Sequence, residues 1–137
     1  MAAVQQAEDT ATADLTNWLD TTYDGISRDA PNAHVVVLGY PVFYDLTTSG
    51  CIGLSSTSRT KIDEGINVVD DIIENTAEAY GFTFGDVRSA WSAGGHQLCG
   101  TGSKWLHALN FGDVSESYHP TADGQAGGYE PAFAAAA

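Results

Sequence analysis

Residues 34–41, HVVVLGYP, decide the fold that this sequence predicts. Four apolar residues follow one another from Val35 to Leu38, and the turn-forming residues Gly39 and Pro41 end the run. A short apolar run between turn signals is typical of a strand buried on both faces, as in a parallel sheet. We therefore expect a buried strand here.

Helical patterns stand on both sides of this strand. Before it, apolar residues recur at helical spacing between residues 4 and 27 and predict one buried face: Val4, Ala7, Ala11, Leu15, Trp18, Leu19 and Ile26. After it, a loop rich in Gly, Ser and Thr (47–58) offers hydroxyls that cap helices. Residues 59–81 then place apolar side chains on one side of a helix and acids on the other: Ile62, Ile66, Val69, Ile73 and Tyr80. Gly81 is suited to follow the last turn of that helix.

The order of these segments predicts an α/β fold. GFTFGDV (81–87) reads as a second short strand, residues 88–118 as irregular, and a last helix begins near Thr121. Two strands joined by a helix are expected to be parallel. Functional residues of such sheets gather at the carboxyl ends of the strands, which here are followed by GYPVFYD and by the segment after residue 87.

The charge balance narrows the range of partners. The chain of 137 residues has 18 acidic and 5 basic residues, a net charge of −13, and no cluster of Lys or Arg. Such a surface repels phosphate backbones and anionic lipids, so we expect no nucleic-acid partner. No run reaches the ~18 apolar residues of a membrane span. The first residues lack the basic flank and apolar core of a signal peptide.

Two cysteines, Cys51 and Cys99, lie in loops rich in Gly and Ser. A pair of free thiols in a reducing compartment is one interpretation. The even count, and a spacing unlike that of metal ligands, favour a disulfide and an oxidising compartment. Closing a loop of this length stabilises a fold by roughly 4 kcal/mol in the chain-entropy model.

One histidine stands apart from the other three. His34, His96 and His107 show no metal-ligand spacing, so they predict structural roles and no metal site. His119 follows Glu116 by three residues and precedes Pro120, in the stretch SESYHPTADGQAGGY. A catalytic histidine needs an acceptor on one ring nitrogen, and Glu116 is near enough in sequence to supply it. On spacing alone, a histidine beside a helix cap is the simpler interpretation.

That same stretch resembles the block D-x-x-H-P-x-x-x-G that introduces the catalytic histidine of the SGNH (GDSL-type) ester hydrolases. The likeness continues through HVVVLGYPVFYD, the helix 59–81, GFTFGDV and GGHQLCG, as in the secreted actinobacterial lipase and phospholipase A1-like branch, and covers essentially the whole chain. The resemblance implies a three-layer parallel-sheet fold of flavodoxin-like type, no cofactor, secretion and a disulfide between Cys51 and Cys99. It also implies that His119 is the general base. The acceptor that orients it is then Glu116, in place of the family's aspartate, or the main-chain carbonyl of Ser117.

The family's nucleophile has no counterpart in this sequence. The serine of its G-D-S block is missing, because Gly85-Asp86 and Gly112-Asp113 are both followed by valine. The G-x-N-D block that supplies an oxyanion donor is imitated only by Gly65-Ile66-Asn67, inside a predicted helix. We therefore interpret residues 1–137 as the C-terminal portion of a single hydrolase domain, without its nucleophile block.

These departures set the functional expectations. A whole protein of this kind would cleave carboxylic esters of lipids, and this chain alone is expected to be inactive. Tyr40, Phe43 and Tyr44 are candidates for the wall of an acyl cleft, or else core aromatics. A non-catalytic secreted binding domain derived from the same fold is the alternative. A sheet that lacks neighbouring strands also predicts self-association through its exposed edge.

Overall fold

The computed structural model describes residues 2–137, which form helices around a short parallel sheet. At the start, α1 (Ala2–Thr10), the π-helical turn η1 (Ala11–Leu15) and α2 (Thr16–Asp29) follow without a break. This confirms the helical prediction, but not its whole buried face: Ala7 is exposed and Trp18 is 58% exposed.

The two predicted strands pair in parallel. β1 (Val36–Leu38) lies beside β2 (Thr83–Gly85), with Val36 opposite Thr83 and Leu38 opposite Gly85. The parallel direction is the one that the connecting helix requires. The expectation of full burial was wrong, because all three residues of β1, which has a strand on one side only, are half-buried.

The connecting helix α3 (Ser56–Ala79) begins and ends at the predicted signals. Ser55 caps its first turn, with Oγ accepting the N–H of Ser58 at 3.1 Å. At the other end Gly81 adopts a positive φ of 72°, a conformation that favours glycine. The prediction that acids fill the solvent side was wrong for Asp63 and Asp70, which are both buried.

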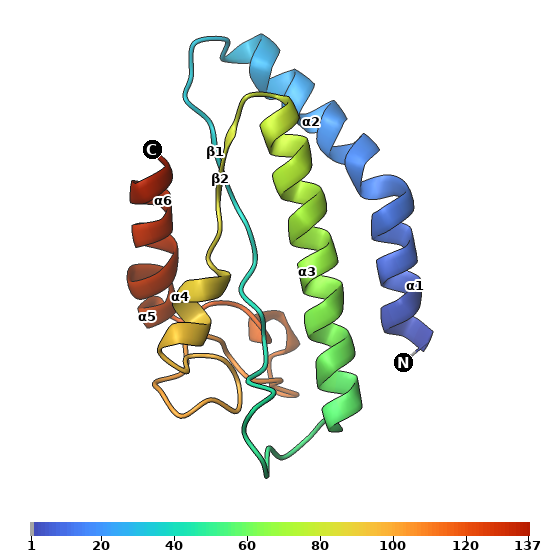
Figure 1. The fold of residues 1–137 in the computed structure, drawn as a ribbon, viewed down its shortest axis with the longest axis vertical. Coiled ribbons are helices and arrows are strands. Elements are labelled where there is room, and N and C mark those ends of the chain that lie inside the picture. The colour runs from blue at the N-terminus through green and yellow to red at the C-terminus, as the bar shows by residue number, and fades with distance from the viewer. Residues whose placement is uncertain (1) are drawn as a thin grey trace.

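Helices cover both faces of the sheet (Figure 1). α3 packs on one face, with the α1–α2 rod against its outer side, and α6 (Glu130–Ala136) packs on the other. The last helical segment begins at Thr121, as predicted, and runs through α5 (Ala122–Gly124) and the π-helical turn η3 (Gln125–Tyr129). Its glycines have a packing role: a Cβ on Gly128 would lie 2.0 Å from the Trp91 ring.

Residues 88–118, expected to be irregular, contain one further helix, α4 (Arg88–Ala93), and a 3-10 turn, η2 (Val114–Glu116). α4 forms where Trp91 is buried completely between Trp105 and Tyr129. Burial of this side chain is a tertiary effect that local spacing does not reveal.

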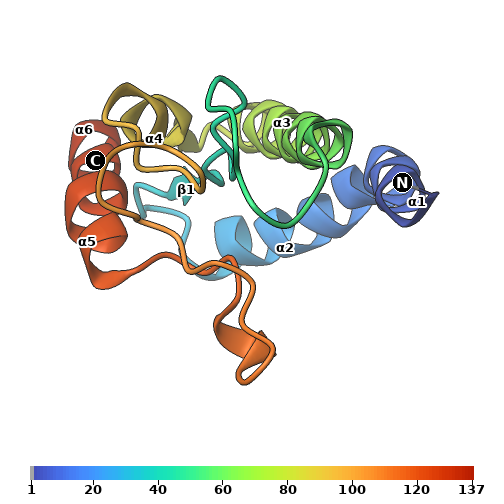
Figure 2. The ribbon, with the colours of Figure 1, turned by 90° about the horizontal axis from the view of Figure 1, so that it is seen from below.

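The long loops gather beyond the carboxyl ends of both strands (Figure 2). Residues 39–55 and 94–121 meet there through an isolated bridge between Tyr44 and Leu98, and a second bridge, between Leu106 and Pro120, joins two parts of the later segment. They enclose a core of buried side chains: Tyr44, Val87, Trp91, Leu98 and Leu106. Within residues 2–137 no helix is both long and apolar enough to cross a membrane.

Candidate active site

His119 lies at this carboxyl end, in a backbone pairing that holds it in place. The His107 N–H donates to the carbonyl of His119 at 2.9 Å, and the Tyr118 N–H donates to the carbonyl of His107 at 2.9 Å. Thr121 follows, with its N–H bonded to the carbonyl of Trp105 and its hydroxyl capping α5. Backbone hydrogen bonds at Tyr118, His119 and Thr121 thus hold the segment around His119 against residues 105–107.

The residue before His119 adopts an unusual backbone conformation. Tyr118 has a φ of +63°, which costs a non-glycine residue of order 1 kcal/mol. Its side chain offsets this with two contacts: the ring stacks on Phe43, with centroids 5.1 Å apart, and its hydroxyl lies 2.8 Å from that of Tyr44. The loop after β1 therefore fixes the turn that presents His119.

The imidazole of His119 is exposed and borders a small cavity of about 210 Å³. The predicted cleft residues Tyr40 and Phe43 line this cavity, together with Leu106 and Tyr129. Tyr44 does not: it is 7% exposed and belongs to the core, and burial raises the pKa of its hydroxyl. The structure therefore brings two of the three predicted cleft aromatics to the histidine.

Glu116 faces a different histidine from the one expected. Its carboxylate lies 3.4 Å from Nδ1 of His107 and also accepts a hydrogen bond from the Asn110 side chain. The paired segments 107–110 and 116–119 bring these groups face to face, whereas His119 meets Glu116 only through its N–H and the Glu116 carbonyl. Within residues 2–137 the His119 imidazole has no hydrogen bond or ion pair, so neither Glu116 nor the Ser117 carbonyl engages it here.

Two buried carboxylates, which sequence patterns did not single out, hold the loop after β1. Asp63 accepts the N–H groups of Phe43 and Tyr44 at 3.1 and 3.2 Å, and Asp70 accepts that of Tyr40 at 2.8 Å. Burial raises the pKa of each carboxyl to about 6. Their burial could have been predicted from their spacing of seven residues, which puts both on the same helix face as the apolar Ile73.

The remaining histidines make structural contacts. His34 Nε2 lies 2.8 Å from the Thr83 hydroxyl, beside the sheet. His96 stacks on Trp105 with centroids 3.6 Å apart, and its Nδ1 lies 2.8 Å from the carbonyl of Ser103. No group of three His, Cys, Asp or Glu side chains in residues 2–137 is arranged to hold a metal ion.

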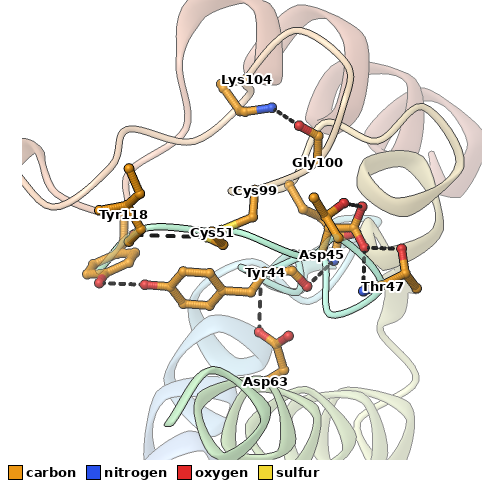
Figure 3. The surroundings of a disulfide bond; sticks show 12 residues. Tyr44, Asp45, Thr47, Cys51, Asp63, Cys99, Gly100, Lys104 and Tyr118 are labelled. Carbon is orange, nitrogen blue, oxygen red and sulfur yellow. Dashed lines mark hydrogen bonds between the residues drawn. A yellow bond between two sulfur atoms is a disulfide. The ribbon is translucent and has the colours of Figure 1, made fainter. Parts of the chain in front are cut away.

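The two cysteines form the predicted disulfide. Cys51 and Cys99 are joined, with Cα atoms 5.5 Å apart, and so tie the loop after β1 to the segment after α4 (Figure 3). Beside them lies a larger cavity of about 1020 Å³. Leu106 and Tyr118 line both cavities and separate the larger one from His119.

An α/β fold with a histidine at the carboxyl end of a parallel sheet, beside an aromatic cavity, is an arrangement found in hydrolases. Comparisons with known proteins support that class. Over its full length the chain is 49% identical to Lipase 1 of Streptomyces coelicolor and covers 50% of that protein. Over 82% of its length it is 46% identical to a lipase of Streptomyces rimosus and covers 41% of it. No family model matches the sequence.

Solved structures agree with these relatives. The fold matches that of an extracellular lipase from Streptomyces rimosus with a TM-score of 0.93 and 40% identity, covering 99% of this chain and 56% of that one. It matches phospholipase A1 from Streptomyces albidoflavus with a TM-score of 0.92 and 38% identity, at the same coverage. These comparisons confirm the resemblance to SGNH-type ester hydrolases of the lipase and phospholipase A1-like branch. The chain spans about half the length of the curated relatives it matches.

Proposed function

We propose that this chain provides the general-base portion of a secreted lipid ester hydrolase, with His119 as the base. The observation that carries the proposal is the His119 imidazole, which is exposed, unpartnered within residues 2–137, and beside a cavity walled by Tyr40 and Phe43. A general base must be free to reach the reacting hydroxyl and be held on a rigid backbone. Similarity to lipases indicates the substrate class, carboxylic esters of lipids.

The proposed chemistry is acyl transfer. A serine hydroxyl, supplied by a complementary segment, attacks the ester carbonyl while His119 accepts its proton. The ester C–O bond then breaks, and His119 returns the proton to the departing alcohol. Water, deprotonated by the same imidazole, releases the acid from the acyl-serine and restores the free hydroxyl.

The isolated chain is proposed to be inactive, because its sequence has neither the G-D-S serine nor the G-x-N-D donor block. Each missing oxyanion donor is worth about 3 kcal/mol of transition-state stabilisation, or a factor of 10²–10³ in rate.

Complementation tests the proposal. The chain is mixed with the part of Streptomyces coelicolor Lipase 1 that it does not cover, and release of nitrophenol from p-nitrophenyl butyrate is followed. We expect no turnover by either part alone, and turnover by the mixture that His119→Ala abolishes and His34→Ala retains. Turnover that survives His119→Ala would contradict the role of this base. A folded mixture without turnover would favour the non-catalytic binding domain.

The orienting group of His119 is tested in the same assay. We propose that the Ser117 carbonyl acts as acceptor, since Glu116 is engaged by His107 and Asn110. Glu116→Gln is then expected to change the rate by no more than about threefold. A loss of several hundredfold in kcat would identify the carboxylate as the orienting group instead, because a histidine without its acceptor loses that much or more.

A further inference from the structure

We propose that Asp63 is a positioning residue: through the loop after β1 it holds the backbone turn at Tyr118 that aims the His119 imidazole. Its importance for catalysis rests on the proposed role of His119 as the base. Its effect on the turn does not, because that effect is measured on the chain alone, without any hydrolysis.

Tyr118 and His119 form a β-bulge opposite His107. The Tyr118 N–H donates to the carbonyl of His107, and the His107 N–H donates to the carbonyl of His119, both at 2.9 Å, so two residues of one segment face a single residue of the other. In this type of bulge the first residue has a left-handed backbone and is usually glycine. Here Tyr118 occupies that position, with a φ of +63°. A bulge bends the chain and re-aims a side chain, which in this segment is that of His119.

The side chain of Tyr118 holds it in this conformation from outside the turn. Its ring stacks on that of Phe43 with an interplanar angle of 11°, and its hydroxyl lies 2.8 Å from that of Tyr44. Phe43 and Tyr44 are consecutive residues of the loop after β1, so both contacts depend on the placement of one short segment. The bulge is therefore as well fixed as residues 43–44 are.

Asp63 fixes that segment from α3. Its Oδ1 accepts the N–H groups of Phe43 and Tyr44 at 3.1 and 3.2 Å, and the side chain is buried at 4% exposure. Figure 3 shows both links of Tyr44, one to the Asp63 carboxylate and one to the Tyr118 hydroxyl. A buried N–H that has lost its acceptor is unfavourable, so removal of the carboxylate frees the loop from α3 and Tyr118 from its support.

Amide hydrogen exchange, followed by NMR on the chain alone, tests this support. The His107 N–H reports on the bulge, and the Thr83 N–H, which donates to the Val35 carbonyl at 3.0 Å, reports on the sheet. Asp63→Ala is expected to speed exchange at His107 at least tenfold more than at Thr83. Asp63→Asn keeps an oxygen for both loop N–H groups and should restore protection to within threefold. Equal acceleration of the two amides by Asp63→Ala, or none at His107, would overturn the positioning role.

Tyr118→Gly separates support by the loop from the preference of the backbone. Glycine suits the φ of +63° better than tyrosine does, but it removes the ring stack and the hydroxyl contact. Exchange at His107, relative to Thr83, should again rise at least tenfold. Exchange that stays the same or slows would mean that the bulge holds itself, and would contradict the role of Asp63.

Two more variants guard against a trivial loss of stability. Asp70→Ala is the matched control, since it removes a buried carboxylate of the same helix that binds the Tyr40 N–H instead, and it should leave the ratio of the two exchange rates unchanged. Tyr44→Phe removes only the hydroxyl that meets Tyr118 and serves if Asp63→Ala does not fold. It should raise the ratio about three- to tenfold, and an unchanged ratio would count against the proposal.

The complementation mixture tests the consequence for catalysis. Asp63→Ala is expected to lower kcat at least tenfold, because a displaced base no longer reaches the reacting hydroxyl, and Asp63→Asn should keep kcat within about threefold. Equal losses in the two variants would contradict positioning through the two N–H groups. A mixture without turnover would count against the proposed function instead, and the exchange rates would then decide the role of Asp63 by themselves.

Discussion

Acidification from pH 7 to pH 5 is expected to stabilise this chain, which is the opposite of what paired surface carboxylates do. The cause lies in Asp63 and Asp70, which are 4% and 0% exposed under the loop that follows β1. Burial raises the pKa of both carboxyls to about 6, against about 4 for an aspartate in water. One oxygen of each has no hydrogen-bond partner, although Nε of Arg88 lies 3.8 Å from that oxygen of Asp70.

The sign follows from proton binding. Between pH 7 and pH 5 the folded chain binds protons at these two sites that the unfolded chain does not, so the free energy of unfolding rises as the pH falls. With a folded pKa of about 6 and an unfolded pKa of about 4, each carboxyl contributes about 1 kcal/mol over this window. Together they contribute about 2–3 kcal/mol, which is lost again as the pH rises through 6.

Asp70→Asn isolates one of the two contributions. The amide keeps a carbonyl oxygen for the Tyr40 N–H but cannot ionise, so the rise in stability should fall to about half. The charged groups that act on Asp70 are Arg88, which lowers its pKa, and Asp86 and Asp71, which raise it; all of them remain in the variant. Glu78→Gln, an exposed position on the same helix, is the matched control and should keep the full rise.

Urea denaturation followed by far-UV circular dichroism measures the effect. The free energy of unfolding is compared at pH 7, 6 and 5 for the unsubstituted chain and both variants. Two results would refute the argument that the buried ionised carboxylates of Asp63 and Asp70 destabilise the fold. One is a free energy of unfolding that falls between pH 7 and pH 5. The other is a rise in Asp70→Asn as large as in the unsubstituted chain.

Further predictions concern packing, the disulfide and association. Gly128→Ala should lower the free energy of unfolding by about 2–3 kcal/mol, because its Cβ would overlap Trp91. Gly25→Ala in α2 has room for the Cβ and should raise the free energy of unfolding by up to about 1 kcal/mol. Equilibrium denaturation of both variants measures this contrast. Replacing Cys51 and Cys99 by serine should remove about 4 kcal/mol in the same measurement, and a loss below 1 kcal/mol would contradict the chain-entropy argument. We also expect concentration-dependent dimers in sedimentation equilibrium, through the edge of the two-stranded sheet, and a strictly monomeric chain would contradict this.

Local sequence signals were sufficient for the two strands, the long helices before and between them, and the last helical segment, but not for α4. The cap at Ser55, the positive φ at Gly81 and the start of the last helix at Thr121 each depend on contacts within about four residues, which spacing reveals directly. The parallel pairing of β1 with β2 followed from a helix between two short strands. Pairing of the two cysteines followed from their even number and their loops.

Tertiary structure decided the partners at the site. Glu116 and His107 are nine positions apart, and Asp63 reaches backbone donors twenty positions away. Helical spacing predicts that an acid on a helix is exposed to solvent. It carries no information about the backbone N–H groups that the loop after β1 brings to the same face of α3, and these groups need acceptors once they are buried. Which carboxylates become buried, and which histidine an acid meets, therefore depends on groups that only folding brings together. The sequence by itself determined the fold class, because the signals for its helices and strands are short-range, whereas His119 was singled out by a family resemblance and not by its spacing.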